Sequence, residues 1–292
     1  MHREFSENSD IRKAEVNKLS SPVKPKMIDG FNRHINYLRI SVTDRCNLRC
    51  VYCMPEDGVK MLNHNEILTF EEIIEVVKTA VQAGVSKIRI TGGEPLVRRG
   101  IVDLVNLISD IPGIKDLSMT TNGILLSQFA KPLKDAGLHR INVSLDTMDP
   151  GEFKMITRGG KLEDVIKGID CALETGLSPI KLNCVIKESS NNDHAQAVKQ
   201  FGESRNIQVR FIKQMDLSAG HFSIVEGGSG GDCAHCNRLR LTANGKIKPC
   251  LFDDQEYDVR SLGAAEALRQ AVTEKPACGS HNYSGEFYNI GG

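Results

Sequence analysis

The chain has 292 residues, of which 40% are hydrophobic, and its 37 Lys and Arg residues are balanced by 37 Asp and Glu residues. No apolar run approaches the roughly 18 residues that a membrane span needs, and a net charge of zero provides no overall basic field to collect nucleic acid. We therefore expect a soluble globular protein that has neither a membrane nor a nucleic acid as its partner.

The first 27 residues are polar and mixed in charge. They lack the apolar stretch of a signal peptide, and their acidic residues disfavour a mitochondrial transit peptide. We expect residues 1–31 to form a mobile or weakly helical extension, and the protein to be cytoplasmic.

Strand-like and helical stretches alternate from residue 32 to residue 215. Between the first two strand-like runs, apolar residues from Phe70 to Val81 recur at helical spacing, with Glu71 and Glu72 on the opposite face. Such repeats predict an α/β fold with parallel strands and right-handed crossovers, either an open partial barrel or a doubly wound sheet. The six strands are expected at residues 38–42, 87–91, 116–121, 140–145, 180–186 and 208–215.

Three cysteines follow the first expected strand with the spacing C-x3-C-x2-C: Cys46, Cys50 and Cys53. A four-iron cluster held by three cysteines keeps one iron without a protein ligand, and a substrate or cofactor can bind that iron. A zinc site that lacks its fourth ligand and a disulfide pair with one spare thiol are the alternatives.

A second set of three cysteines lies far downstream and consists of Cys233, Cys236 and Cys250. Residues 237–249 between them alternate apolar and polar side chains around Asn244-Gly245, which predicts a β-hairpin that folds Cys250 back beside the other two. With six of the nine cysteines in two such sets, the pattern favours a metal protein of a reducing compartment over a disulfide scaffold.

The alternative for this second set is a zinc knuckle. Zinc prefers four ligands, and Cys278, His281 or His235 could supply the fourth.

Polar residues end the next three expected strands. Thr91-Gly92-Gly93-Glu94-Pro95 closes the second strand, and its glycines let the backbone approach a ligand that a Cβ atom would block, although a plain turn explains this run nearly as well. Thr120 and Ser144 stand near the ends of the third and fourth strands. Because ligands gather at the carboxyl ends of parallel strands, these residues and the first cysteine set are expected to share one site.

The stretch from Cys46 to Cys53 resembles the signature of the radical S-adenosylmethionine (SAM) superfamily, in which SAM chelates the open iron of a cluster. Further segments narrow the resemblance to the GTP 3',8-cyclases of molybdenum cofactor biosynthesis, over residues 32–215 and 233–292. These segments are Arg39–Cys46, Lys87–Leu96, Thr120–Gly123, Ile141–Asp146, Arg210–Ile212, Cys236–Ala243 and Gly291–Gly292.

The resemblance implies an open partial (β/α)6 barrel of the radical SAM type at residues 32–215 and a small cluster-binding domain with a glycine tail at residues 216–292. It implies a lyase that uses SAM and two 4Fe-4S clusters, one on each cysteine set. The reaction would convert GTP to (8S)-3',8-cyclo-7,8-dihydroguanosine 5'-triphosphate.

The resemblance also implies roles for individual residues. SAM would contact Tyr52, Gly93, Glu94, Thr120, Ser144 and Met215. GTP would contact a set of basic residues, which suits a triphosphate: Arg39, Lys87, Arg89, Lys181, Arg210, Arg238 and Arg240. Catalytic roles would fall to Arg39, Arg238, Arg240, Gly291 and Gly292. For a lone arginine pair such as Arg238 and Arg240, a solvated strand face is the alternative.

Partners implied by the resemblance are a reductant such as flavodoxin or ferredoxin and, downstream, the cyclic pyranopterin monophosphate synthase. A homodimer is a further expectation.

The chain departs from the family between Met215 and Cys233. Only 17 residues lie there, whereas the family has several dozen more, and Glu226–Gly231 has the composition of a flexible linker. Two alternatives therefore stay open: another radical SAM enzyme with an accessory cluster, such as a peptide-modifying maturase, and an inactive shortened metal-binding homologue.

Overall fold

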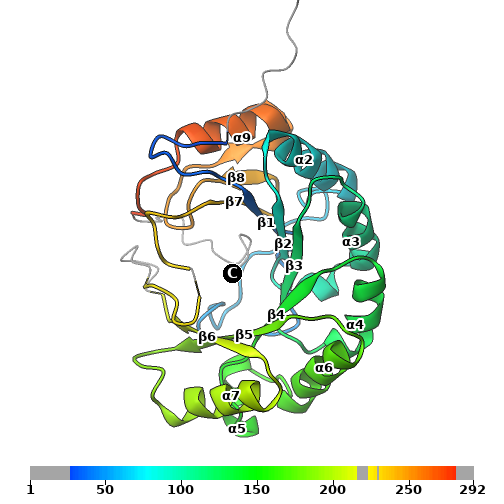
Figure 1. The fold of residues 1–292 in the computed structure, drawn as a ribbon, viewed down its shortest axis with the longest axis vertical. Coiled ribbons are helices and arrows are strands. Elements are labelled where there is room, and N and C mark those ends of the chain that lie inside the picture. The colour runs from blue at the N-terminus through cyan, green and yellow to red at the C-terminus, as the bar shows by residue number, and fades with distance from the viewer. Residues whose placement is uncertain (1–26, 216–222, 229, 281–292) are drawn as a thin grey trace, which may run out of the picture.

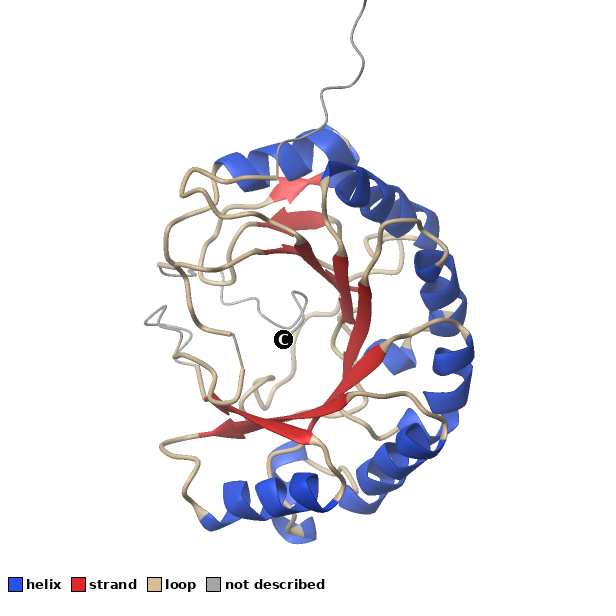
Figure 2. Ribbon diagram, in the orientation of Figure 1, coloured by secondary structure: helices blue, strands red, loops and turns tan. Residues whose placement is uncertain are grey.

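The computed structural model describes residues 27–215, 223–228 and 230–280. Within these ranges one nine-stranded sheet curves into an open barrel, and helices cover its outer face (Figures 1 and 2). The predicted partial barrel is thus confirmed over the doubly wound sheet. Most of the expected N-terminal extension, at residues 1–26, and the tail at residues 281–292 with Gly291 and Gly292 lie outside the described residues.

The sheet has the strand order β6-β5-β4-β3-β2-β1-β7-β8-β9, in which neighbours from β6 to β7 are parallel and the last two pairs are antiparallel. All six expected strands form, with ends within two residues of the predicted ones. The strands are β1 Tyr37–Ser41, β2 Lys87–Thr91, β3 Asp116–Thr121, β4 Arg140–Ser144, β5 Ile180–Ile186, β6 Gln208–Lys213, β7 Arg238–Leu241, β8 Lys246–Lys248 and β9 Tyr257–Asp258.

Helices connect the parallel strands and pack on the convex face of the sheet. In the described part of the chain, no helix combines the length and the apolar character that a membrane crossing requires. The helices are α2 Phe70–Ala83, the 3-10 turn η1 Pro95–Val97, α3 Ile101–Ser109, α4 Leu126–Asp135, α5 Pro150–Thr157, α6 Leu162–Glu174, α7 Asp193–Ser204, α8 Val259–Leu262 and α9 Ala264–Thr273.

Each barrel strand separates apolar from polar side chains. In β1, Leu38 and Ile40 are fully buried in the hydrophobic core, where the fully buried Ile73 and Val77 of α2 also lie, while Arg39 between them points to the opposite, concave face. The parallel register repeats this division from strand to strand, since residues of the same kind stand side by side. The alternation therefore gives the barrel an apolar exterior under the helices and a polar interior.

The predicted hairpin of the second cysteine set joins the same sheet. Strands β7 and β8 pair in antiparallel fashion around Gly245, and β7 lies parallel to β1 on the side away from β2. This register places Arg238 beside Tyr37 and Arg240 beside Arg39. The C-terminal segment thus extends the inner face of the barrel.

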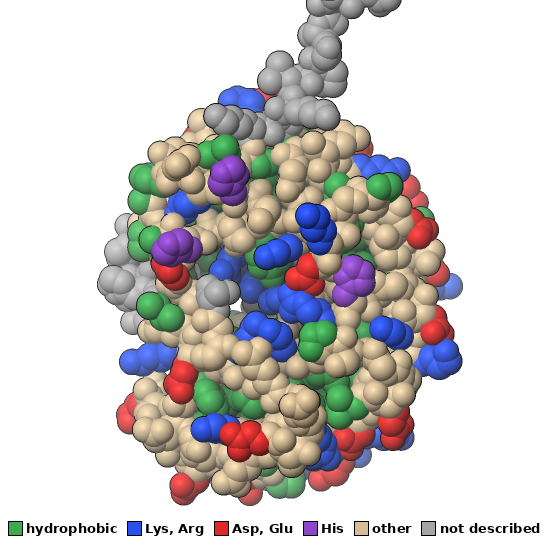
Figure 3. All heavy atoms as spheres, viewed as in Figure 1, with side chains coloured by type: hydrophobic (Ala, Val, Ile, Leu, Met, Phe, Trp, Pro, Cys, Tyr) green, Lys and Arg blue, Asp and Glu red, His purple; other side chains and the backbone are tan. Residues whose placement is uncertain are grey.

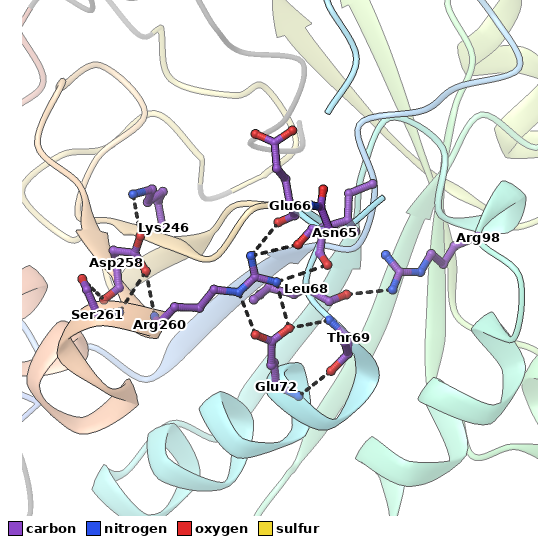
Figure 4. Close-up of polar contacts among 11 residues, drawn as sticks. Asn65, Glu66, Leu68, Thr69, Glu72, Arg98, Lys246, Asp258, Arg260 and Ser261 are labelled. Carbon is purple, nitrogen blue, oxygen red and sulfur yellow. Dashed lines mark hydrogen bonds and ion pairs between the residues drawn. The ribbon is translucent and has the colours of Figure 1, made fainter. Parts of the chain in front are cut away.

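Arg260 of α8 ties this C-terminal segment to the first helix of the barrel (Figure 4). Its guanidinium donates to both carboxylate oxygens of Glu72, at 2.7 and 3.0 Å, and to the backbone oxygens of Asn65 and Glu66. The Glu72 carboxylate also accepts from the backbone nitrogen of Thr69, which closes a capping box at the start of α2. One arginine therefore links two segments almost 190 residues apart.

We expect Arg260→Ala to lower the free energy of unfolding by about 1–2 kcal/mol, because it removes a bidentate ion pair and hydrogen bonds to carbonyl groups. Urea unfolding followed by circular dichroism measures this loss. Arg269→Ala is the matched control, since Arg269 makes a similar bidentate pair with Glu266 but on the exposed side of a single helix, α9. Equal midpoints for both variants would contradict a role of Arg260 in joining the two segments.

Candidate active site

The first cysteine set occupies the loop that follows β1, at the carboxyl end of the parallel strands. The three thiols affect one another electrostatically: burial, with smaller contributions from Cys53, Asp146 and Cys46, raises the pKa of Cys50 to about 12, and burial also raises the pKa of Cys46 and Cys53. Ionising all three without a compensating cation is therefore unfavourable. A cationic iron cluster would supply that compensation, so the donor set fits the group that the spacing predicts.

Contacts from other elements fix the shape of this loop. The backbone nitrogen of Leu48 and the amide of Asn122 lie 3.4 and 3.7 Å from the Cys46 sulfur. From the end of α5, the Arg158 guanidinium donates to the carbonyl oxygens of Arg49 and Met54. All nine cysteines carry free thiols, so these contacts and not a disulfide hold the loop.

Gly92 and Gly93 allow the loop after β2 to pack against the loop after β1. A Cβ atom on Gly93 would lie 2.4 Å from the carbonyl oxygen of Arg45, and one on Gly92 would lie 2.9 Å from that of Thr43. The Gly93 and Glu94 nitrogens instead donate to the Thr43 and Arg45 oxygens. The close approach that the glycines permit is thus to the backbone just before Cys46.

Glu94 is almost completely buried, with 1% of its surface exposed. One carboxylate oxygen accepts from the Thr121 hydroxyl and the Leu96 nitrogen, and the other accepts from the Asn122 nitrogen at 2.7 Å. Burial raises its pKa to about 7, despite these donors. A ligand cation near Glu94 would stabilise its charged form.

The remaining predicted SAM contacts are Tyr52, Ser144, Thr120 and Met215. Tyr52 donates its hydroxyl to Asp146 at 2.6 Å, and the two residues link the cysteine loop to the end of β4, where Ser144 lies. The hydroxyl of Thr120 is buried and has no partner among the described residues, as expected for a group that a ligand completes. Met215 stands two residues past the carboxyl end of β6.

Met215 and Cys250 both pack against the buried pair Leu251 and Phe252. This small apolar cluster stands beside the second cysteine set.

Basic side chains gather around the hollow at the centre of the barrel (Figure 3). Their centre is the ring of Tyr37, because the guanidinium carbons of Arg39, Arg89 and Arg238 lie 5.7, 5.5 and 5.9 Å from its centroid. The sequence prediction named these three arginines but missed Tyr37. The strand alternation contained the signal, since Tyr37 stands two residues before Arg39 and so shares its face.

Burial disfavours the charged forms of these arginines. It lowers the pKa of Arg89 and Arg240 to about 9, and only 6% and 5% of their surfaces are exposed. Burial also lowers the pKa of Arg210 and Lys181, and Lys87 is exposed at the amino end of β2.

Along strands β1 to β7, Asp116 is the only carboxylate on this inner face, and both of its oxygens accept from Arg140 at 2.8 and 2.6 Å. The Nε atoms of Arg210 and Arg238 are buried and have no hydrogen-bond acceptor in the described part of the chain. The interior therefore has donors and positive charge that an anionic ligand would satisfy. Arg140 was absent from the sequence prediction.

The second cysteine set lines a cavity together with Arg238 and Arg240. Burial opposes ionisation of Cys236, but Lys275 and Arg238 outweigh it and lower the pKa of this thiol. Lys275 is itself buried and donates to the carbonyl oxygens of Arg238 and Pro249. The prediction that Cys233, Cys236 and Cys250 come together around the hairpin agrees with this cavity.

Arg33 fastens the second cysteine set to the barrel. Its guanidinium donates to the backbone oxygens of Cys233, Pro276 and Ala277 at 2.7, 2.6 and 2.9 Å, and to the buried carboxylate of Asp29 at 2.6 Å. Nothing in the local sequence distinguishes Arg33 from a surface arginine, so only the structure assigns it this role.

In the described ranges, no three His, Cys, Asp or Glu side chains converge closely enough to hold a single metal ion. Sulfur ligands of one zinc ion lie about 3.8 Å apart, given Zn–S bonds of about 2.3 Å and tetrahedral geometry. The irons of a cluster are distributed over its corners, so its cysteines stand further apart.

The two cysteine sets lie at opposite ends of the barrel interior. Cys46 follows the carboxyl end of β1, whereas Cys236 precedes the amino end of the parallel neighbour β7. Arg39 and Arg240, side by side in the register, stand between them.

Two family models match the chain. The Radical SAM superfamily model matches residues 40–201, and the Molybdenum Cofactor Synthesis C model matches residues 185–278.

Curated relatives named GTP 3',8-cyclase are similar over most of their length. The chain is 41% identical to that of Thermodesulfovibrio yellowstonii, with 85% of this chain and 91% of the relative covered. It is 44% identical to that of Pelotomaculum thermopropionicum, with 86% and 94% covered. The alignment with the Thermodesulfovibrio yellowstonii protein has 294 positions, but only 85% of the 292 residues of this chain take part in it. The alignment therefore contains gaps in this chain, which agrees with a shortened segment.

Two solved structures share the fold. Streptococcus suis SuiB, bound to S-adenosylmethionine, superposes with a TM-score of 0.58 at 15% identity and covers 91% of this chain and 68% of its own. The structure of anSMEcpe with AdoMet and a peptide superposes with a TM-score of 0.56 at 15% identity, covering 82% and 81%.

The superfamily model spans more than half of the chain, and the two relatives described above are 41% and 44% identical to it over most of its length. The chain therefore belongs to the radical SAM superfamily and, within it, to the GTP 3',8-cyclase family.

Proposed function

We propose that this chain is a GTP 3',8-cyclase, a lyase that uses SAM and two 4Fe-4S clusters to convert GTP to (8S)-3',8-cyclo-7,8-dihydroguanosine 5'-triphosphate. The observation that carries the proposal is the group of buried arginines between two three-cysteine sites. A nucleotide suits both features, because its phosphates can pair with the arginines and its base can bind the metal of one cysteine site. The curated relatives carry this activity in their names.

The triphosphate would lie against the inner faces of the barrel strands. Arg39, Arg89 and Arg238 converge on Tyr37, and Arg210 offers a buried donor without an acceptor. Lys87 and Lys181 add charge at the ends of the group. Phosphate oxygens would relieve the repulsion between these cations and restore the charged forms that burial disfavours.

Cys46, Cys50 and Cys53 would hold the first cluster and Cys233, Cys236 and Cys250 the second. When bound, the first cluster and SAM supply a carbon-centred radical that removes a hydrogen atom from the substrate.

The chain's own residues position the reactants for this step. Glu94 offers a carboxylate to the SAM ammonium group, with Gly93, Tyr52, Thr120, Ser144 and Met215 as further proposed contacts. Arg238 and Arg240 line the cavity of the second site and would hold the nucleotide there, with Arg39 between the two sites. Catalytic roles for Gly291 and Gly292 stay a prediction from the sequence.

The domain limits at residues 31 and 215 are also proposals that come from the sequence. So are a flavodoxin- or ferredoxin-type reductant, the cyclic pyranopterin monophosphate synthase as the next enzyme, and a homodimer. The free thiols of both cysteine sets favour a reducing compartment, which supports the cytoplasm as the location.

Replacing Arg238 with Ala is expected to weaken GTP binding by about 1.5–3 kcal/mol, because a charge-assisted contact is lost, while SAM cleavage without GTP persists. Anaerobic calorimetry with GTP and ATP measures the affinity and its base specificity. Arg205→Ala is the control, since Arg205 pairs with Asp170 on the outer surface. Equal affinity for GTP and ATP would count against guanine recognition and favour a different radical SAM enzyme.

Changing Cys46, Cys50 and Cys53 together to Ala should abolish SAM cleavage and leave about half of the iron, because the two sites share no ligands. Iron and sulfide analysis after anaerobic reconstitution checks this. Stoichiometric zinc at the second site of anaerobically purified protein would be incompatible with the proposal.

Glu94 should make the stability of the cluster-free protein depend on pH. Its folded pKa of about 7 lies above its ordinary value of 4.5. Below pH 4.5 both states are protonated and stability is complete; as the pH rises to 7 the unfolded state releases its proton first, and stability falls on the order of 3 kcal/mol.

Glu94→Gln should therefore lose less stability than the parent between pH 5 and pH 7.5, whatever its absolute stability. Urea midpoints at the two pH values provide the comparison. Parallel pH profiles for both proteins would show that the folded carboxyl titrates normally.

A further inference from the structure

A fourth thiol stands in the cavity of the second site. The Cys278 sulfur lies 3.4 Å from the Cys233 sulfur, and Cys278 lines the same cavity as Cys233, Cys236 and Cys250. The side chain of Cys278 is exposed, whereas those of the other three are partly buried. The proposed reaction gives this thiol no role.

The fold builds the Cys278 segment onto the cysteine hairpin. Arg33 holds the carbonyl oxygens of Pro276 and Ala277 together with that of Cys233. On the other side of Cys278, the Ser280 nitrogen donates to the Phe252 carbonyl at 2.8 Å.

Gly279 makes the closest approach of this segment. A Cβ atom there would lie 3.3 Å from the Cys250 sulfur and 2.7 Å from the Cβ atom of Phe252. The segment after α9 is therefore anchored on both sides of Cys278, and its thiol is held at the cavity by the structure around it.

We propose that Cys278 is a fourth thiolate ligand of the second cluster and binds, in the nucleotide-free protein, the iron that Cys233, Cys236 and Cys250 leave open. This inference rests on the second cluster of the proposed function. On binding, the Cys278 thiol releases its proton to solvent and forms an iron–sulfur bond in place of a bound water, with no change of oxidation state.

Its exposure makes Cys278 the ligand best suited to exchange. The sulfurs of Cys278 and Cys233 are nearer than ligands on two different irons would be, and the exposed side chain has room to rotate away from Cys233. Arg238 and Arg240 line the same cavity, so an anionic nucleotide entering it is attracted to the position that Cys278 occupies. GTP would then replace the thiolate, and the thiol would recover its proton.

The test uses the full chain with Cys46, Cys50 and Cys53 changed to Ala, so that only the second site loads with isotopically enriched iron. Mössbauer spectra are recorded for this protein and for the same protein carrying Cys278→Ser, each with and without GTP. Cys171→Ser in the same background is the control, because Cys171 is a half-buried residue of α6 outside both sites. Metal analysis and thiol mapping by mass spectrometry accompany the spectra.

Without nucleotide, the protein with Cys278 should show four sulfur-coordinated irons, and Cys278→Ser should show one distinct iron amounting to about a quarter of the absorption. Cys278→Ser should also lose that iron to ferricyanide roughly tenfold faster, since an exchangeable thiolate no longer protects it. The Cys171→Ser control should behave like its parent.

A distinct iron already present in the nucleotide-free parent, and unchanged by Cys278→Ser, would overturn the proposal. So would stoichiometric zinc on four thiolates, or a Cys233–Cys278 disulfide in anaerobically prepared, reconstituted protein. If Cys278→Ser creates the distinct iron but GTP alters neither spectrum, the ligand assignment stands and GTP as the substrate of this site fails instead.

Discussion

Positive charge held inside an apolar shell is the constraint on which the rest of this structure depends. Tyr37 gathers three guanidinium groups, of which Arg89 is 6% exposed, and Arg240, with 5% of its surface exposed, stands beside Arg39 on the same face. Such a group is unfavourable without counter-charge, and along β1 to β7 the inner face provides only Asp116, which Arg140 already occupies. The barrel is stable enough to hold this group because the outer face of each strand contributes apolar burial under the helices.

The two cysteine loops lie outside the apolar core and are held by hydrogen bonds to their backbone. Neither cysteine set lies in the regular core: the first follows β1 and the second flanks the β7–β8 hairpin. Backbone oxygens of both loops are held by arginines that enter from other elements, Arg158 for the first and Arg33 for the second. Because hydrogen bonds to carbonyl groups set the loop shape, the thiols remain free for metal.

The sequence alone could predict the strands, the hairpin and both cysteine sets, because period-two alternation and cysteine spacing are local signals. It could also place the basic residues on one face, since Arg39 and Arg89 alternate with isoleucine and leucine. It could not predict the contacts of Arg33, Lys275 or Arg260, whose partners lie on segments far away in the chain. Nor could it show that Gly93 accommodates the Arg45 backbone, because a glycine-rich strand end looks the same whether a ligand or the chain itself comes close.

The parallel pairing of β1 with β7 has a consequence for the substrate. One cysteine set follows the carboxyl end of β1 and the other precedes the amino end of β7, so the five residues of β1, roughly 17 Å of strand, lie between their two loops. A small ligand bound at one end could not reach the other. An extended molecule could, if its base met the second site and its sugar and phosphates continued along the arginines toward the first site. The geometry therefore selects a nucleotide over a small anion, and it explains why the arginines lie on the strands that join the two sites.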